Sequence, residues 1–588
     1  MTDSVSSKLP HGPNRRRMLD PDNDLSDMVD TSYRAGLSEL TGGLSPNALA
    51  QLYFNWMTHL STLPGKRSEL TQHAAHNMID FGQYLTKCAL DVPAEGCAHP
   101  DARDRRFRYE GWEKFPFNVY KQGFLLTQQW WDDATTNVRG VTKANERAIN
   151  FTARQFLDAM SPANFPLTNP EVLDKVRETK GHNFAEGAKN FQEDIRRYFF
   201  HEKPAATEEF RVGRELAATP GKVVFRNHLI ELIQYDAVTE KVHPEPILIT
   251  PAWIMKYYIL DLSPENSMVK YLTEQGFTVF MISWRNPGVE DADLGMNDYR
   301  EQGPMAALDQ VLEITGAEKV HGVGYCLGGT LLSIAAAAMA RDGDDRLASL
   351  TLFAAQSDFT EAGELMLFIS EAEVAFLEDM MWKNGYLDAA QMAGAFQLLR
   401  SSDLIWSRMQ HEYLMGERPH GNDLMAWNAD TTRMPYRMHS EYLRYLFLNN
   451  AFAAGHFEVG GRSVTPTDLR IPIFAVGTET DHVAPWKSVF KIDTLSRSEV
   501  TFVLTNGGHN AGVVSEPGHP RRHFRVHTNP DSAPNVAPDE WLELAEMKQG
   551  SWWPEWSTWL SERSGAQCAP PKSGKSICDA PGTYVMME

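Results

Sequence analysis

The chain has 588 residues, of which 42% are hydrophobic and 11% aromatic. This length and composition exclude a largely disordered protein and favour two or more structural units with a sizeable core. The net charge of −21 at pH 7 repels phosphate backbones, so we predict that nucleic acid is not a partner.

The first two segments along the chain differ in their patterning. Residues 1–45 are polar and rich in Ser, Pro, Asp and Asn, which predicts a mobile N-terminal segment. From 46 to 205, apolar residues recur at three- and four-residue spacing, as in Phe117, Tyr120 and Phe124. This periodicity predicts a helical N-terminal domain.

At about residue 206 the pattern changes to short apolar runs alternating with helices, which predicts a catalytic domain over 206–588. Ser263 followed by Pro264 predicts a helix over 263–275, and an Ala-rich run predicts a second over 330–340. Such alternation is typical of a parallel sheet covered on both faces, hence of an α/β fold. We expect strands at 223–235 (two short strands), 246–250, 277–282, 320–323, 347–355, 471–476 and 501–504.

Two segments interrupt or follow this alternation. Residues 360–465 are helical in pattern and rich in Met and aromatic residues, and we expect them to form a cap insertion over the carboxyl ends of the strands. The tail over 562–588 is turn-rich, and we expect it to be extended.

Cysteine usage points to a reducing compartment. The five cysteines are widely spaced and form no Cys-x-x-Cys pair, so we expect neither a disulfide framework nor a metal site. The polar start of the chain shows no apolar secretion signal, and the most apolar helical run, 331–339, is far shorter than a membrane span. We therefore predict a cytoplasmic location and no transmembrane segment.

One of these cysteines lies in the strongest local motif of the chain. Gly322 to Gly329 follows a predicted strand, opens a predicted helix and has the form G-x-C-x-G around Cys326. This is the pattern of a nucleophile elbow with Cys in place of Ser. Glycines two residues on either side allow the tight turn, and the helix N-terminus favours a thiolate. We therefore predict that Cys326 is a nucleophile, the alternative being a buried cysteine in a glycine-rich turn.

A nucleophile elbow requires an acid and then a histidine later in the chain. Asp481 follows the predicted strand 471–476, and His509 follows the strand 501–504 between glycine-rich residues, so we assign these two as the acid and the base. Asp358 and Glu479 remain alternative acids, and His482 remains an alternative base. We expect His411 and His439 to be surface or packing residues.

The chemistry predicted for these residues is acyl transfer. The Cys326 thiolate attacks an acyl carbon, His509 takes the proton, and Asp481 fixes the imidazole tautomer or assists a proton transfer. The developing oxyanion needs two N–H donors, which we expect from the backbone of Leu327 and of Ala252 or Trp253. Exchange between thioesters is nearly isoenergetic, so a cysteine favours transfer over hydrolysis, and an apolar cap would exclude water.

These motifs also resemble those of polyhydroxyalkanoate synthases, the bacterial polyester polymerases. The resemblance is carried by GYCLGGT around Cys326, the run from Pro251 to Pro287, ETDHVAPW and GGHNAG. It extends to DRRF, SPANFPLTNPEVL, NDLMAWNAD and GSWWPEW, and so covers residues 100–561. The layout is similar to the single-subunit type that uses short-chain substrates.

The resemblance implies an α/β-hydrolase fold with a helical cap and a helical N-terminal domain. It implies an (R)-3-hydroxyacyl-CoA substrate, above all 3-hydroxybutyryl-CoA, with no cofactor. The family residue that matches His509 activates the thiol, and the one that matches Asp481 activates the attacking hydroxyl. The resemblance also implies a homodimer bound to the surface of polyester granules.

Further contacts follow less directly from the resemblance. Trp427 matches a family tryptophan near the site, the alternative being a core residue of the cap. The stretch after His509 is longer and more basic than in the family, and Arg521, Arg522 and Arg525 would meet CoA phosphates or else lie in a solvated loop. Ser357 precedes Asp358 where the family more often has Leu, which leaves the preferred acyl length open.

Two other functions remain compatible with these residues. The first is a cysteine hydrolase of the same fold acting on thioesters or lactones, although small hydrolases lack the large cap and the N-terminal domain. The second is a non-catalytic granule-surface protein, which the presence of all three catalytic residue types disfavours.

Overall fold

The structure is a computed structural model that describes residues 25–588 except 42, 91, 93–94, 102–103, 201, 389–390, 392–393, 395–400 and 532–533. The chain forms two compact units. What we call the sheet unit comprises the described residues of Met1–Gly43, Thr207–Gln391 and Asn422–Glu588, and the helical unit those of Leu44–Ala206 and Met392–Gly421.

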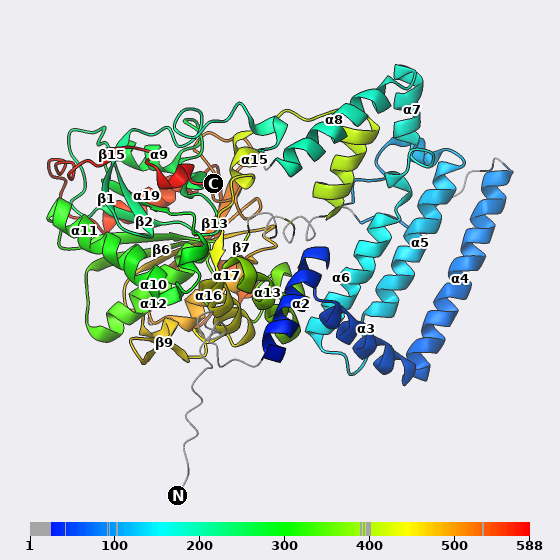
Figure 1. Ribbon diagram of the computed structural model, residues 1–588, viewed down its shortest axis with the longest axis horizontal. Helices are drawn as coiled ribbons and strands as arrows, with labels where there is room; N and C mark the ends of the chain where they lie inside the picture. Colours follow the sequence, from blue (N-terminus) through cyan, green and yellow to red (C-terminus); the bar gives the residue numbers. More distant parts are fainter. Residues whose placement is uncertain are drawn as a thin grey trace, which may run out of the picture. The chain divides into compact units, whose positions relative to one another are not determined.

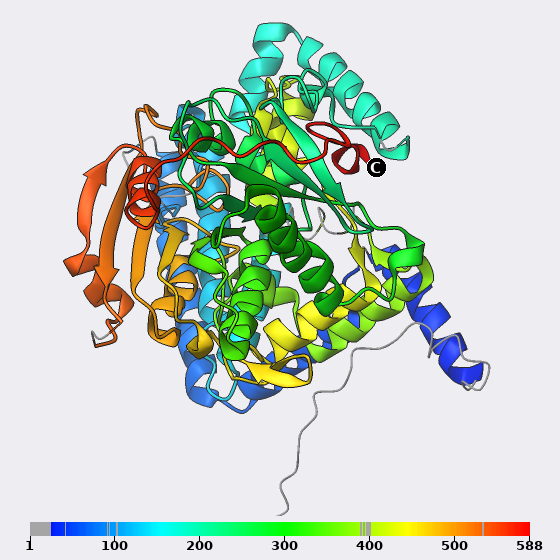
Figure 2. The same ribbon diagram turned by 90° about the vertical axis from the view of Figure 1, so that its left-hand side faces the viewer.

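The sheet unit is built on one large mixed sheet (Figures 1 and 2). Its central strands are parallel: β3 (Ile247–Thr250), β4 (Val279–Trp284), β5 (Val320–Tyr325), β6 (Leu347–Phe353), β11 (Ile473–Thr478) and β12 (Val500–Thr505). Antiparallel strands flank them: β1 (Gly221–Arg226), β2 (Ile230–Tyr235), β13 (His523–Asn529), β14 (Glu546–Gln549) and β15 (Cys578–Asp579). The described strands follow the order β14-β13-β12-β11-β6-β5-β3-β4-β2-β1-β15.

Strand β5 shows why apolar runs form this sheet. Val323 faces an apolar cluster that contains Trp556 of α19 (Trp553–Glu562) and Met268 of α9 (Met268–Glu274). Gly322 faces the opposite side, where a Cβ atom would meet Leu332 of α12 (Leu327–Asp342). Helices thus cover both faces, so a strand must be apolar on both sides. The predicted α/β-hydrolase fold is confirmed by this topology.

The predicted strands agree with the structure to within a few residues, but one helix starts elsewhere, and the edge strands β13, β14 and β15 were not predicted. Helix α9 begins after Ser267, whose side chain accepts from the Lys270 N–H, and not after Ser263. The basic stretch after His509, expected as a loop, contains β13, in which the buried Phe524 alternates with exposed or half-buried polar residues. Figure 2 shows β13 and β14 in orange at one edge of the sheet.

The tail after α19 returns along the sheet to its opposite edge. Cys568 exchanges two backbone hydrogen bonds with Val242. Farther on, β15 pairs with β1, and the buried Glu231 carboxylate accepts the N–H groups of Thr583 and Tyr584. The extended course of the tail is therefore fixed by hydrogen bonds.

The N-terminal segment differs from the prediction of mobility over 1–45. Residues 25–41 form helix α2 (Leu25–Thr41), whereas residues 1–24 lie outside the described part of the chain. Helix α2 packs on α13 (Glu371–Asn384), with Ala35 buried and an Arg34–Asp379 ion pair of 2.9 Å. Packing against α13, which is distant in the sequence, thus orders helix α2 although the composition of this segment is polar.

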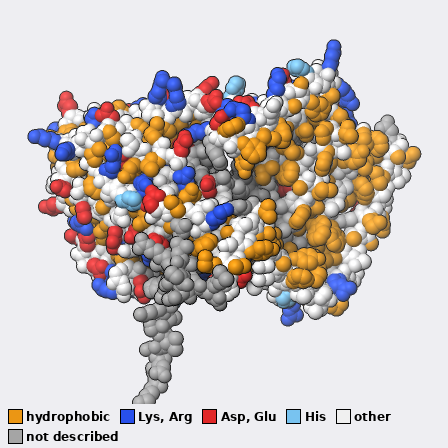
Figure 3. Space-filling view, in the orientation of Figure 1, with side chains coloured by type: hydrophobic (Ala, Val, Ile, Leu, Met, Phe, Trp, Pro, Cys, Tyr) orange, Lys and Arg blue, Asp and Glu red, His pale blue; other side chains and the backbone are white. Residues whose placement is uncertain are grey.

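The helical unit contains α3 (Pro46–Ser61), α4 (Pro64–Ala89), α5 (Phe117–Thr135), α6 (Lys143–Ala159), α7 (Pro170–Thr179) and α8 (His182–Phe199). Its core consists of small apolar clusters, one around Trp112 and Phe107 and another around Trp56 and Ile149. Many of its large apolar side chains are exposed, and Figure 3 shows orange side chains gathered over these helices. None of the described helices is long and apolar enough to cross a membrane.

The predicted cap over 360–465 is not one structural body. Part of it belongs to the sheet unit, namely α13, α15 (Asp423–Asn428), α16 (Tyr436–Glu441) and the π-helical η10 (Tyr442–Leu448). By contrast, η9 (Met409–Leu414) packs on α8 within the helical unit. Most of residues 389–400 lie outside the described part.

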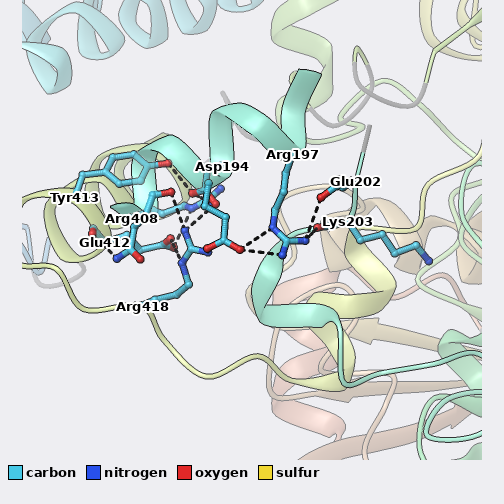
Figure 4. A network of polar contacts seen from close by, with 10 residues as sticks. Asp194, Arg197, Glu202, Lys203, Arg408, Glu412, Tyr413 and Arg418 are labelled. Carbon is cyan, nitrogen blue, oxygen red and sulfur yellow. Dashed lines mark hydrogen bonds and ion pairs between the residues drawn. The ribbon is translucent and has the colours of Figure 1, made fainter. Parts of the chain in front are cut away.

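A polar network ties the second part of the cap region to α8 (Figure 4). The Asp194 carboxylate accepts from Arg408, Tyr413 and Arg418, each at 2.8 Å. Gly187 permits close packing, because a Cβ atom there would lie 1.9 Å from the Tyr413 carbonyl oxygen. These contacts hold residues 401–421 in the helical unit. No local sequence pattern predicts them, because the partners lie far apart in the chain.

Candidate active site

Cys326 occupies the sharp turn between β5 and α12. Its backbone has φ 52° and ψ −125°, a strained conformation for a residue with a side chain. A Cβ atom at Gly324 would lie 2.3 Å from Gly329 Cα, and one at Gly328 would lie 2.2 Å from the Thr250 carbonyl oxygen. Only glycine fits both positions, so the elbow geometry predicted from the motif is present.

Asp481 and His509 come together at the carboxyl ends of neighbouring strands, β11 and β12. The His509 Nδ1 atom lies 2.7 Å from Asp481 Oδ2, which also accepts from Thr478 Oγ1 at 3.1 Å. The other carboxylate oxygen accepts the N–H groups of Val483 and Ala484, each at 2.8 Å. The carboxylate side chain is fully buried, so it holds Nδ1 protonated and leaves Nε2 available.

The electrostatics favour an ion pair between these residues. Burial opposes ionisation of Asp481, but the His509 imidazole and the backbone N–H groups outweigh it and lower the pKa of the carboxyl. Burial likewise opposes protonation of His509, but the charge of Asp481, followed by the charge and hydrogen bond of Cys326, holds the pKa of the imidazole well above its usual range. The imidazole is thus hydrogen-bonded to Asp481, and the charge of Cys326 also favours its protonated form.

The structure gives the alternative acids and bases other contacts. Asp358 is 2.9 Å from Lys491 Nζ and accepts from Asn450 Nδ2 at 3.0 Å. Glu479 lies 3.6 Å from His523 Nε2. His439 is enclosed in the sheet unit, where burial lowers its pKa to about 3, and His411 belongs to the helical unit. His482 is the neighbour of Asp481, and its carbonyl oxygen accepts the Glu364 N–H at 2.9 Å.

The residues predicted to supply the oxyanion donors lie at the start of α12 and in the loop after β3. Helix α12 lies against the loop after β3, as the close approach of Gly328 to Thr250 requires. Ala252 and Trp253 follow in that loop and are buried. Within the described part of the chain, the structure shows no acceptor for the N–H groups of Leu327, Ala252 and Trp253. A role of these N–H groups as oxyanion donors stays a prediction.

A cluster of aromatic rings includes Trp253, one of these residues. Its central residue, Tyr442, was not predicted from the sequence. Tyr442 of η10 is buried, and burial and the nearby Cys326 charge both raise its pKa. Its ring lies 6.5 Å from Trp253, 6.5 Å from Phe359 and 5.2 Å from Phe447. The only sequence signal was the aromatic richness of the cap, which does not single out one ring.

The residues predicted to bind substrate have protein partners. Trp427 lies in the core and donates its indole N–H to the Lys256 carbonyl at 2.8 Å. Arg522 donates to the Asn506 and Val514 carbonyls, and Arg525 to the Ala545 carbonyl at 3.1 Å. These contacts support structural roles for Trp427, Arg522 and Arg525. A contact of Arg521 or its neighbours with CoA stays a prediction.

Comparisons with known proteins place this geometry in context. Residues 103–272 match the family model described as the N-terminus of poly-β-hydroxybutyrate polymerase, and 25–66 match a second N-terminal model of that polymerase. Residues 245–515 match the α/β-hydrolase fold.

Curated relatives match over most of the chain. A poly(3-hydroxyalkanoate) polymerase of Methylorubrum extorquens is 39% identical, covering 84% of this chain and 82% of the relative. A polymerase subunit of Rhizobium meliloti is 38% identical, covering 89% and 86%. The corresponding subunit of Cupriavidus necator is 36% identical, covering 84% and 85%.

Proposed function

The chain belongs to the poly(3-hydroxyalkanoate) polymerase family, and we propose that it builds a polyester from (R)-3-hydroxyacyl-CoA through a thioester on Cys326. Identity to these polymerases along most of the chain carries the proposal. The Cys326–His509–Asp481 arrangement supplies a chemical route. The reaction requires no cofactor, because the CoA thioester is itself the activated substrate.

The first half-reaction loads the acyl group. His509 Nε2 takes the Cys326 proton, and the sulfur attacks the thioester carbonyl carbon. The N–H groups of Leu327 and of Ala252 or Trp253 hold the oxyanion. The carbon–sulfur bond to CoA then breaks, and the leaving CoA thiolate takes the proton from the His509 imidazolium.

The second half-reaction forms the ester bond. A hydroxyl group of the growing chain or of another monomer attacks the Cys326 thioester, and its proton passes to a base as the new ester forms and the thiol is restored. We assign this base to His509. Asp481 is fully buried, accepts four hydrogen bonds and has a lowered pKa, which makes it an orienting group and a poor proton acceptor.

The surroundings favour transfer over hydrolysis. Tyr442, whose pKa the charge of Cys326 raises, packs against Trp253 and Phe359, and this apolar group would disfavour water as the second nucleophile. The exposed apolar side chains of the helical unit, such as Phe156, Leu167 and Tyr198, support association with a polyester granule. We infer a homodimer from the family resemblance alone.

Product analysis tests the proposal. Incubation with (R)-3-hydroxybutyryl-CoA is expected to release CoA and yield insoluble polymer, and Cys326→Ala is expected to abolish both. Free 3-hydroxybutyrate as the only product would instead identify a hydrolase. Granule binding without CoA release would identify a surface protein.

A further inference from the structure

The loop that carries His509 has no regular secondary structure of its own. Residues 506–515 run between β12 and β13, and several of their carbonyl groups accept hydrogen bonds from side chains outside the loop. A loop exposed to solvent would leave these carbonyls to water. Here the segment Gly550–Trp556 contacts the loop from outside, and the proposed chemistry assigns this segment no role.

We propose that Ser551, Trp552 and Trp553 form a clamp that positions His509 for proton transfer with Cys326. This inference rests on the proposed function, because it assigns these residues a part in the same reaction. They are positioning residues, since each acts through the loop backbone.

Two indole groups make the central contacts of the clamp. Trp552 Nε1 donates to the Gly512 carbonyl at 3.1 Å, and Trp553 Nε1 donates to the Val513 carbonyl at 3.0 Å. Both tryptophans are fully buried, so water cannot replace a missing donor at low cost. Ser551 Oγ adds a hydrogen bond to the Ser515 carbonyl. Three consecutive side chains therefore hold the C-terminal half of the loop.

Arg522 holds the loop from its other side. Its guanidinium donates to the Asn506 carbonyl at 3.4 Å and to the Val514 carbonyl at 3.3 Å, bridging the two ends of the loop. The Arg522 carbonyl accepts the Gly550 N–H at 2.8 Å, which joins the arginine to the clamp. The loop is thereby enclosed between two linked groups of donors.

The clamp is anchored to the strand that fixes the cysteine. The Phe353 carbonyl at the end of β6 accepts the Cys326 N–H at 2.9 Å. The Phe353 ring lies 5.1 Å from the ring of Trp552 and 5.0 Å from that of Trp556. Trp556 also donates to Thr351 Oγ1 on β6 at 3.0 Å. The same group of contacts thus reaches both the Cys326 backbone and the loop that carries His509.

Single Trp→Phe variants test the clamp, because they remove the indole N–H and keep an aromatic ring. Trp559→Phe is the matched control: Trp559 lies in α19, as Trp553 does, is buried and donates to Thr501 Oγ1 on β12. We expect Trp552→Phe and Trp553→Phe to lower kcat for CoA release about tenfold with little change in KM. The control should keep kcat within about twofold.

Two further readouts separate positioning from a loss of folding. The rate of Cys326 alkylation by iodoacetamide, measured against pH, should change in the clamp variants because the imidazole is displaced, and it should be unchanged in Trp559→Phe. If a Trp variant fails to fold, Ser551→Ala removes one donor with little loss of volume and should lower kcat about threefold.

The clamp is overturned if the folded clamp variants match Trp559→Phe in kcat and in the alkylation profile. A wild-type protein that releases no CoA would contradict the proposed function. In that case the alkylation profile still decides the clamp, since it reports the Cys326–His509 contact without any substrate.

Discussion

Replacing Asp481 by Asn should disable the imidazole with little change in shape. The N–H groups of Val483 and Ala484 require an oxygen acceptor, so the amide oxygen takes the position of Oδ1. The amide NH2 then faces His509 Nδ1, which must accept a hydrogen bond and leave the proton on Nε2. That tautomer cannot take the proton of Cys326. The charge-assisted hydrogen bond of 2.7 Å is lost as well, at a cost of about 1.5–3 kcal/mol.

Together these effects should lower kcat for CoA release roughly 100-fold. The pKa of His509 should fall, because the charge of Asp481 raises it and burial alone lowers it. Cys326 alkylation at about pH 6 should therefore slow, since less imidazolium is present to stabilise the thiolate. A quenched assay of CoA thiol release measures kcat, and mass spectrometry after alkylation measures the reactivity of Cys326.

Asp358→Asn is the control for this prediction, because Asp358 pairs with Lys491 and Asn450, whereas Asp481 is the carboxylate that contacts His509. Its kcat should stay within about threefold of the wild-type value. The reasoning fails if Asp481→Asn keeps more than about a third of the wild-type kcat, or if Asp358→Asn shows the larger loss.

Three further predictions concern folding. Gly328→Ala should abolish stable folding, since its Cβ atom would lie 2.2 Å from the Thr250 carbonyl, whereas Gly82→Ala, with open space around it, should raise or keep the melting temperature. Burial lowers the pKa of His321 to about 4 in the folded protein. As the pH falls, this imidazole therefore becomes protonated in the unfolded chain before it does in the folded chain. The free energy of unfolding should therefore drop by about 3 kcal/mol between pH 6.5 and 4 in urea titrations, and by less in His321→Gln. Asp194→Ala should expose 401–421 to limited proteolysis, because it removes three hydrogen bonds to that segment; unchanged cleavage would contradict this.

The sequence predicts the sheet well because its signals are local. Buried parallel strands must be apolar on both faces, and the runs around 247–250 and 473–478 show this directly. Strand β13 was missed because His, Arg and Thr occupy its exposed positions and mask the alternation of Phe524 and Val526. Helix α2 was missed because it depends on α13, a partner more than three hundred residues later in the chain.

The residues of the site likewise fall into those that the local sequence predicts and those that it does not. Cys326, Asp481 and His509 are predictable because each lies at a strand end within its own motif. Tyr442 and the clamp residues are not predictable in this way. Their roles depend on contacts with residues far away in the sequence, which only the fold brings close. The indole donors of Trp552 and Trp553 have no local pattern that names the carbonyls of Gly512 and Val513.

The acyl-enzyme itself tests the central claim most directly. Protein mixed with limiting (R)-3-hydroxybutyryl-CoA and quenched in acid should yield a Cys326 peptide that carries a 3-hydroxybutyryl group or a short oligomer of it. Hydroxylamine should remove this group, and Cys326→Ser should not form the thioester. Polymer formation by Cys326→Ala, or an acyl group on any residue other than Cys326, would contradict the account.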